Sequence, residues 1–364
     1  MKNKLIMLVG AVLMTGACAQ LPRIDVQAHN NELMENQEIE RIRTILNRAE
    51  YEQSLQEFRR FEAEKPQSMY FQAARLGEAE SLAGLERHGE AATMLRDIYL
   101  KTVRYQPEIA ARAMYQLSFA YEAEGDDAKT IASLLDAQKL SQHLPRETAR
   151  AEIPARLAMV YGKSGREVEA RSYLSQADRG LMELMTEEKL GDEWLAKTYY
   201  QMGSVSTAQV STENYSSVVQ GQKMVQVYLF RSMALNKGVW SQKSLAHLKS
   251  TYRDLFSQLN VSAPVNAGTA AAEQREMGAE LVDLINQAEL YKPVNAKQTN
   301  GLQKDFFSYL TGIKVKTEAL LYQTRETMTL TPESEKLNSL KREGRMRGPM
   351  LLPAKVVPSE DPNL

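Results

Sequence analysis

Few residues of this 364-residue chain have the types and spacing that enzyme chemistry requires. Gly162-Lys163-Ser164 matches the end of a phosphate-binding loop, but Leu157 stands where the loop needs its first glycine, and helices rather than a strand are predicted around it. No Gly-x-Ser-x-Gly nucleophile elbow occurs. The histidines lack the paired spacing of a zinc motif, and an acidic cluster lacks the EF-hand spacing: His29, His88, His143 and His247; Glu122, Glu124, Asp126 and Asp127. We therefore expect no catalytic residues, no metal site and no nucleotide site.

The one residue with a specific chemical context is Cys18, the only cysteine of the chain. Lys2 and Lys4 form a short basic region, and an uncharged, mostly apolar run of ten residues follows from Leu5 to Met14. Ten residues are too few to cross a bilayer as a helix, which needs about 20. Residues 1–17 therefore have the three-zone pattern of an export signal that ends in small residues just before the cysteine.

This arrangement resembles the lipobox of bacterial lipoproteins, although Thr15 occupies the place where the family usually has leucine. The resemblance implies that the Cys18 sulfur is alkylated by diacylglycerol and that the new amino terminus is acylated after cleavage. Ala19, rather than aspartate, follows the cysteine, which implies the outer membrane, with the protein facing the periplasm. The alternatives are an ordinary secretory signal with an accidental cysteine, or a cytosolic protein with a free buried cysteine. No other cofactor is expected.

Composition excludes several classes of protein. With 45 Lys+Arg against 46 Asp+Glu, the net charge is −1, so a simple nucleic-acid binder is not expected. Loss of residues 1–17 would remove two lysines and no acid, which makes the processed chain −3. A single cysteine excludes a disulfide framework. One basic cluster, at Lys341, Arg342, Arg345 and Arg347, is compatible with lipid headgroups or nucleic acid, but a solvated tail is the simpler interpretation.

The apolar spacing predicts helices throughout the central part of the chain. Residues 18–37 are polar and are predicted to form a tether between the lipid and the fold. From residue 38 the spacing is helical, as in Ile39, Ile42, Leu46 and then Tyr51, Leu55, Phe58. Prolines are far enough apart to permit helices of about 12 to 20 residues, and strand signals are absent.

The helices are predicted to repeat with a period of 36 to 40 residues. Gly89, Gly125 and Gly165 each stand between two helical patterns, and Ala49 holds the same place earlier. Around the last two glycines, small and large residues occur at matching offsets: Leu117, Ser118, Tyr121, Leu134 and Ala137; Leu157, Ala158, Tyr161, Ala170, Leu174 and Ala177. Glycine permits a tight turn, small residues permit close approach, and large residues fill the space between hairpins.

This pattern resembles the tetratricopeptide repeat (TPR) over about residues 38–180. The run from Tyr51 to Ser68 also resembles the opening repeats of periplasmic lipoproteins of the β-barrel assembly and Tol-Pal coordinator types. The resemblance implies an all-α solenoid of antiparallel helix pairs, whose first helices line a groove for a peptide or a partner helix. The groove positions of the family correspond to Leu76, Ala79, Arg112, Tyr115, Phe119, Glu152 and Met159. Tyr115 and Phe119, four residues apart, are alternatively core residues.

The domain organisation follows from the decay of the repeat. We predict a TPR-like domain over residues 38–260, a linker at 261–272 that contains Pro264 and Gly268, and C-terminal helices at 273–330 that either cap the array or form a separate hairpin. Residues 331–364 contain Pro349, Pro353, Pro358 and Pro362 and are predicted to be disordered.

The predicted localisation and the predicted fold together indicate a non-catalytic lipoprotein scaffold. It is expected to bind proteins of the bacterial cell envelope, such as assembly, secretion, pilus or cell-wall machinery. Its expected partners are proteins and, through the lipid, the membrane; neither nucleic acid nor a small-molecule substrate is expected. Two alternatives remain: an envelope enzyme whose site has no motif, which a perturbed acid pair in a pocket would favour, and a structural link between membrane and cell wall.

Overall fold

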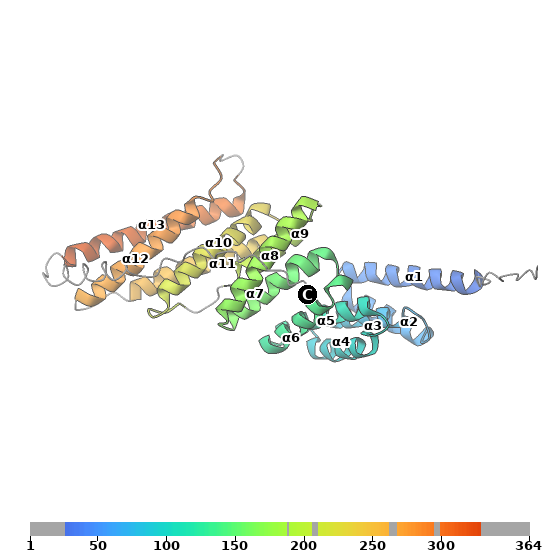
Figure 1. The fold of residues 1–364 in the computed structure, drawn as a ribbon. Helices are drawn as coiled ribbons and strands as arrows, with labels where there is room; N and C mark the ends of the chain where they lie inside the picture. The colour runs from blue at the N-terminus through green and yellow to red at the C-terminus, as the bar shows by residue number, and fades with distance from the viewer. Residues whose placement is uncertain (1–25, 188, 206–209, 262–267, 295–298, 329–364) are drawn as a thin grey trace, which may run out of the picture. The chain divides into compact units, whose positions relative to one another are not determined.

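A computed structural model describes residues 26–187, 189–205, 210–261, 268–294 and 299–328 of the chain. Every regular element in these ranges is helical (Figure 1), which confirms the all-α class of antiparallel helix pairs. The signal region with Cys18, the basic cluster and the predicted tail at 331–364 lie outside the described residues. No helix in the described ranges is long and apolar enough to span a membrane.

The chain divides into two compact units, residues 1–116 and 117–364, and the division falls inside one helix, α5. The helices up to the division are α1 (Val26–Asn47), α2 (Tyr51–Glu64), α3 (Phe71–Gly84), α4 (His88–Thr102) and the first part of α5 (Pro107–Ala123).

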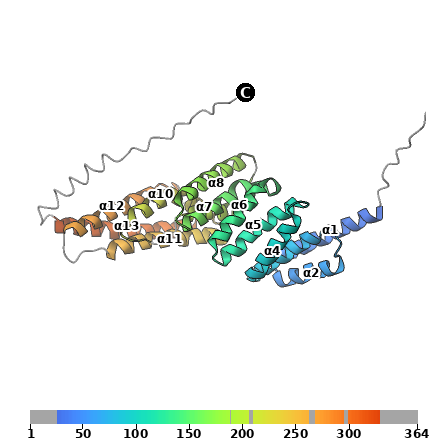
Figure 2. The same cartoon turned by 60° about the horizontal axis from the view of Figure 1, so that its bottom comes forward.

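In the first unit, α1 is longer than the sequence predicts. Residues 26–37, expected as part of the tether, are helical, because apolar spacing marks only the packed part of a helix, which starts at Ile39. The polar first half of α1 projects past α2 (Figures 1 and 2). Glu35 in this half accepts from Ser68 at 2.7 Å, and Glu38, just after it, accepts from Lys65 at 2.6 Å.

The hairpin turns contain left-handed residues, and one of them corrects the predicted repeat. Positive φ occurs at Ala49 (60°), Gly125 (76°) and Gly165 (73°) as expected, but the turn between α3 and α4 uses Glu86 (63°). Gly89 lies within the first turn of α4. The prediction placed this turn three residues too late because it assumed that glycine must supply the left-handed conformation.

With Glu86 as the turn residue, all four hairpins share one packing register. The position seven residues before the turn is buried in each case, and so are the positions nine and twelve residues after it. The three sets are Ile42, Ala79, Ser118 and Ala158; Phe58, Leu95, Leu134 and Leu174; Phe61, Ile98, Ala137 and Ala177. The apparently poor match of the second repeat was therefore an error of register, not a weak repeat.

The second unit continues the pairs with α6 (Asp127–Lys139), α7 (Ile153–Lys163), α8 (Glu167–Glu187), α9 (Asp192–Gly203) and α10 (Tyr215–Leu235). A 3-10 turn (Ser141–His143) and a π-helical turn, η2 (Thr148–Glu152), precede α7. Pro154 has no N–H for the carbonyl of Arg150, and this carbonyl instead approaches α8 at Gly180, where a Cβ would lie 2.0 Å from the oxygen. A glycine at position 180 is therefore needed for the close approach of the π turn to α8.

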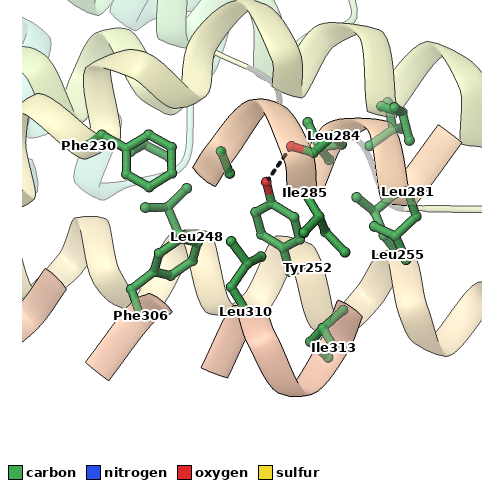
Figure 3. Close-up of a cluster of buried hydrophobic side chains, with 14 of the residues drawn as sticks. Phe230, Leu248, Tyr252, Leu255, Leu281, Leu284, Ile285, Phe306, Leu310 and Ile313 are labelled. Atoms are coloured by element: carbon green, nitrogen blue, oxygen red, sulfur yellow. Dashed lines mark hydrogen bonds between the residues drawn. The ribbon is translucent and has the colours of Figure 1, made fainter. Parts of the chain in front are cut away.

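The end of the second unit is a bundle of α10, α11 (Gly238–Val261), α12 (Gly268–Glu289) and α13 (Gly301–Met328). These helices share one core, in which Phe230, Tyr252 and Phe306 pack with leucines and isoleucines of all four (Figure 3). The Tyr252 hydroxyl lies 3.3 Å from the Leu284 carbonyl oxygen and 2.9 Å from Oε1 of Gln226.

The predicted domain boundaries at 260 and 273 do not separate two bodies in the structure. Residues 268–272 of the expected linker begin α12, since the alanines there favour a helix more than the nearby proline and glycine favour a turn. The core of the bundle also joins helices from both sides of the expected linker, because α12 and α13 bury their apolar faces against α10 and α11.

Candidate functional site

First helices of successive pairs in the second unit bring an aromatic ring and two cations together. Phe119 of α5 is half-buried, with the guanidinium carbon of Arg156 of α7 at 3.5 Å from its ring centroid. The ammonium nitrogen of Lys197, on α9, lies 5.1 Å from the same centroid. Cations over a ring face are attracted by its quadrupole. Three helices that are far apart in the sequence thus hold one aromatic side chain in place.

Glu152 is buried at the end of the π turn, next to this ring. Its Oε1 accepts a hydrogen bond from Lys197 at 2.5 Å, and its Oε2 accepts one from the indole N–H of Trp194 at 3.2 Å. A buried carboxylate requires such partners, because desolvation of an unpaired charge is costly. Glu152 therefore links α7 to α9 and fixes the ammonium that faces Phe119.

Arg156 is fully buried, and α5 supplies two of its hydrogen-bond partners. Its guanidinium donates to Oγ of Ser118 at 2.6 Å and to Oε2 of Glu122 at 2.5 Å. Arginine suits this place because its planar group can stack on a ring while its edges donate hydrogen bonds. We call Phe119, Glu152, Arg156, Met159 and Lys197 the first-helix surface of the second unit.

The predicted groove residues differ in their burial and in the unit to which they belong. Glu152, Phe119 and the half-buried Met159 lie on first helices of the second unit, and the half-buried Tyr115 lies on the part of α5 in the first unit. Leu76 and Ala79 are instead fully buried, so assigning them to a groove was wrong. For Ala79 the cause is the misplaced turn, since counting from Glu86 puts it with the buried Ser118 and Ala158. Leu76 falls at the place of Tyr115 in the corrected count, so its burial is a difference between repeats and not an error of register.

Counting from Glu86 places Glu80 of α3 where Phe119 and Met159 stand in the later repeats. Glu80 accepts hydrogen bonds from Arg112 at 3.3 Å and from Gln116 at 3.2 Å. Burial raises the pKa of its carboxyl. Sequence analysis missed Glu80, although the spacing alone would have identified it once the turn was placed correctly.

A perturbed acid pair lies between α2 and α3. Burial first, and the carboxylate of Glu78 second, raise the pKa of Glu62 to about 8. Arg59 donates to Glu78 at 2.7 Å, while Arg75 is bound to Asp97 of α4 at 2.6 Å. Such pairs occur in active sites, but they also occur in structural ion networks. The connections to three helices of the first unit identify this one as part of a packing network.

A cavity of about 370 Å³ lies between α8 and α10, which are second helices of their pairs. Apolar residues form much of its lining, with Ser216, Ser217 and Gln220 at one side: Ala170, Leu174, Val205, Met224 and Val225. Gly162 also lines this cavity. It packs closely on the chain after α9, since a Cβ at this position would lie 1.9 Å from the Val205 carbonyl oxygen. Gly162 and Lys163 of the triplet lie in the last turn of α7 and Ser164 follows it, so the triplet has no phosphate-loop geometry.

The acidic cluster is a set of helix-end contacts. The Asp126 side chain accepts the Lys129 backbone N–H, which caps α6, and it also binds the Lys129 ammonium at 2.7 Å. The side-chain bond first, and the backbone bond second, lower the pKa of Asp126. Asp127 accepts from Lys163 at 2.8 Å, and Glu122 binds Arg156. No cluster of three or more His, Cys, Asp or Glu side chains suited to a metal ion occurs in the described ranges.

Comparison with known proteins gives little further guidance. No protein-family model and no curated protein matches the chain. Among solved structures, it is similar to BtubC (BKLC) from P. vanneervenii, with 15% identity and a TM-score of 0.39 over 91% of this chain and 99% of that one. It is also similar to the TPR2AB domain of yeast Sti1, solved with pHSP90, with 13% identity and a TM-score of 0.31 over 78% and 98%.

Proposed function

We propose that this chain is a non-catalytic scaffold lipoprotein, anchored to the bacterial outer membrane through lipid on Cys18, that binds envelope proteins through the first-helix surface. The anchor follows from the sequence alone, since Cys18 lies outside the described residues. The binding role follows from the arrangement around Phe119.

The main support for a binding role is that the Phe119 ring is fixed in position by neighbouring helices. The side chain is only half-buried, yet Arg156 and Lys197 fix it from neighbouring helices. Aromatic side chains in defined positions are common anchors at protein interfaces. Because the ring is already ordered, a partner would lose less side-chain entropy on binding.

The charges around the ring suggest which partners fit. Each cation is bound to a carboxylate, Arg156 to Glu122 and Lys197 to Glu152. The surface therefore offers an aromatic anchor within a balanced polar frame rather than a field of one sign. An extended peptide or helix with an apolar side chain suits it, and its affinity should change little with salt.

The test is capture of the partner by the native envelope protein and its Phe119→Ala variant after cross-linking. We expect the variant to keep its helical circular-dichroism signal and to bind the partner at least about fivefold more weakly, as for loss of an anchor. Tyr115→Ala tests in the same way whether the first unit contributes to partner binding. Val168→Ala, at an exposed position of α8, is the matched control. Equal capture by the Phe119 variant would refute this surface, and cross-linking to peptidoglycan without protein would favour the cell-wall link.

The anchor has a separate test. Cys18→Ser should prevent attachment of lipid because oxygen does not replace sulfur in the alkylation step. The variant is expected to remain unprocessed or to leave the membrane fraction, with a changed mobility. If it fractionates and migrates like the parent protein, the lipoprotein assignment is wrong.

A further inference from the structure

The C-terminal end of α4 and the connection to α5 carry large apolar side chains in solvent. Leu100 is 69% exposed and Tyr105 is 84% exposed. The amide of Gln106 donates to the Met69 carbonyl oxygen at 3.2 Å, which brings the 56% exposed Met69 to the same place. Single exposed apolar residues are ordinary, but three of them at one end of one unit form a patch.

Cations surround these side chains. Arg96 and Leu100 are four residues apart on one face of α4, and Arg104 lies in the connection that follows the helix. Lys101 is bound to Asp97, which also binds Arg75. Within the part of the chain that the structure describes, Arg96 and Arg104 form no ion pair. We call Arg96, Leu100, Lys101, Arg104 and Tyr105 the α4 patch.

Stabilisation of the helix explains only part of this arrangement. A cation in the last turn of α4 interacts favourably with the helix dipole, and this accounts for Lys101. Arg96 lies nearly two turns from the helix end, where the dipole has little effect. Neither helix stability nor packing within the first unit accounts for Leu100 and Tyr105.

The α4 patch lies at the end of the first unit that leads back to Cys18. Ser68 is bonded to Glu35 in the projecting half of α1, and the next residue, Met69, is bonded to Gln106 beside the patch. The projecting half of α1, the α2–α3 connection and the α4–α5 connection are therefore at one end. The chain continues from Val26 back to Cys18 over only a few residues, so a lipid there would keep this end near a bilayer.

We propose that the α4 patch binds the anionic headgroups of a lipid bilayer. Arg96 and Arg104 would bind phosphate oxygens through their guanidinium groups, while Leu100 and Tyr105 enter the interfacial layer. Glu32, Glu35 and Glu64 line a cavity beside α1, so contact through α4 rather than α1 is favoured. This inference rests on the proposed lipid anchor for its orientation, but the affinity for anionic lipid belongs to the patch.

The test uses the processed chain, residues 18–364, with Cys18→Ser, so that no lipid is attached. Binding is measured by flotation with vesicles of phosphatidylcholine, with and without phosphatidylglycerol, at low and high salt. We expect binding to the anionic vesicles only, and loss at high salt. Arg96→Gln with Arg104→Gln should weaken it about tenfold or more, and Leu100→Ser with Tyr105→Ser should also weaken it. Arg171→Gln with Arg179→Gln, on α8, removes the same charge and should have little effect.

The outcomes separate this inference from the anchor. Absence of flotation, equal binding to neutral vesicles, or equal loss in the α8 control would each overturn the role of the α4 patch. None of these results bears on lipid at Cys18, which the fractionation of the full-length Cys18→Ser variant decides. Circular dichroism of each variant excludes a loss of fold as the cause.

Discussion

The hairpins from α6 to α9 and the bundle from α10 to α13 belong to one unit but are packed by different means. Between the hairpins, small residues such as Ala158 and Ala177 let helices approach closely, and buried charges such as Arg156 and Glu152 fill the remaining space. The bundle is held by one large apolar core with several aromatic rings (Figure 3). The charges that hold the half-buried Phe119 in place are therefore within the hairpins, and the bundle is better suited to support them.

The largest expected effect concerns the bundle. Phe306→Ala removes a ring that packs on Phe230, Tyr252 and Phe307 at centroid distances of 5.3, 5.8 and 5.4 Å. Such truncations typically cost about 3 to 5 kcal/mol of unfolding free energy. Denaturant unfolding measures the loss, and hydrogen exchange shows where it falls. Faster exchange in α7 and α8 as well as in the bundle would mean that the two regions are one cooperative body.

The next effect concerns the close approach at the start of α7. Gly180→Ala places a methyl group against the Arg150 carbonyl oxygen, which belongs to backbone and has little freedom to move. We expect a loss of about 3 kcal/mol, at the upper end of the usual range for overpacking. Thermal unfolding is the measurement. Gly191→Ala is the control, since a Cβ there meets no atom within 4 Å.

A smaller effect tests the shared register of the hairpins. Ala158→Leu adds volume where α7 is fully buried, and we expect it to cost about 1 to 2 kcal/mol. Ala132→Leu, at an exposed position of α6, should leave the melting temperature nearly unchanged. Similar melting temperatures for the two variants would contradict the register drawn from the left-handed turns.

The smallest effect depends on pH and belongs to the first unit. Because the folded protein holds the proton of Glu62 up to about pH 8, against a reference value of 4.5, its stabilisation is greatest below pH 4.5 and is lost as the pH rises through 8. Glu62→Gln imitates the protonated carboxyl, so the variant should be more stable than the parent at pH 9 and similar to it at pH 5. Thermal unfolding at both values is the check, and a constant difference between the variant and the parent would argue against the raised pKa of Glu62.

The spacing of residues predicted the hairpins well because each repeats a local rule. Gly125 and Gly165 supply left-handed turns without steric cost, and Ser118 and Ala158 recur at fixed distances from them. The candidate site could be predicted in part, since Phe119, Glu152 and Met159 were reached by counting from these turns. Ala79 was misplaced because Glu86 adopts a left-handed conformation that is unusual for its residue type. Leu76 is buried at a place that is half-buried at Tyr115 in the next repeat, and the spacing does not encode that difference.

Other features depend on contacts that no spacing encodes. Arg156 and Lys197 meet Phe119 only after three helix pairs have formed, so their side chains gave no local signal. The acid pair of Glu62 and Glu78 arises from the packing of α2 on α3. The first half of α1 lacks an apolar face, and the bundle does not repeat the hairpin pattern. The periodicity of the sequence does not predict such contacts between residues that are far apart in the chain.

The π turn at Thr148–Glu152 changes the phase of the helix that follows it. A π turn takes up one more residue than an α turn, so an insertion can be absorbed inside a helix instead of in a loop. Side chains before and after it then point in directions that a count of 3.6 residues per turn does not give. A search for further members of this architecture should therefore align α7 in two segments, one before Glu152 and one after it, and should require Pro154 and Gly180 together, since the first frees a carbonyl and the second leaves room for it.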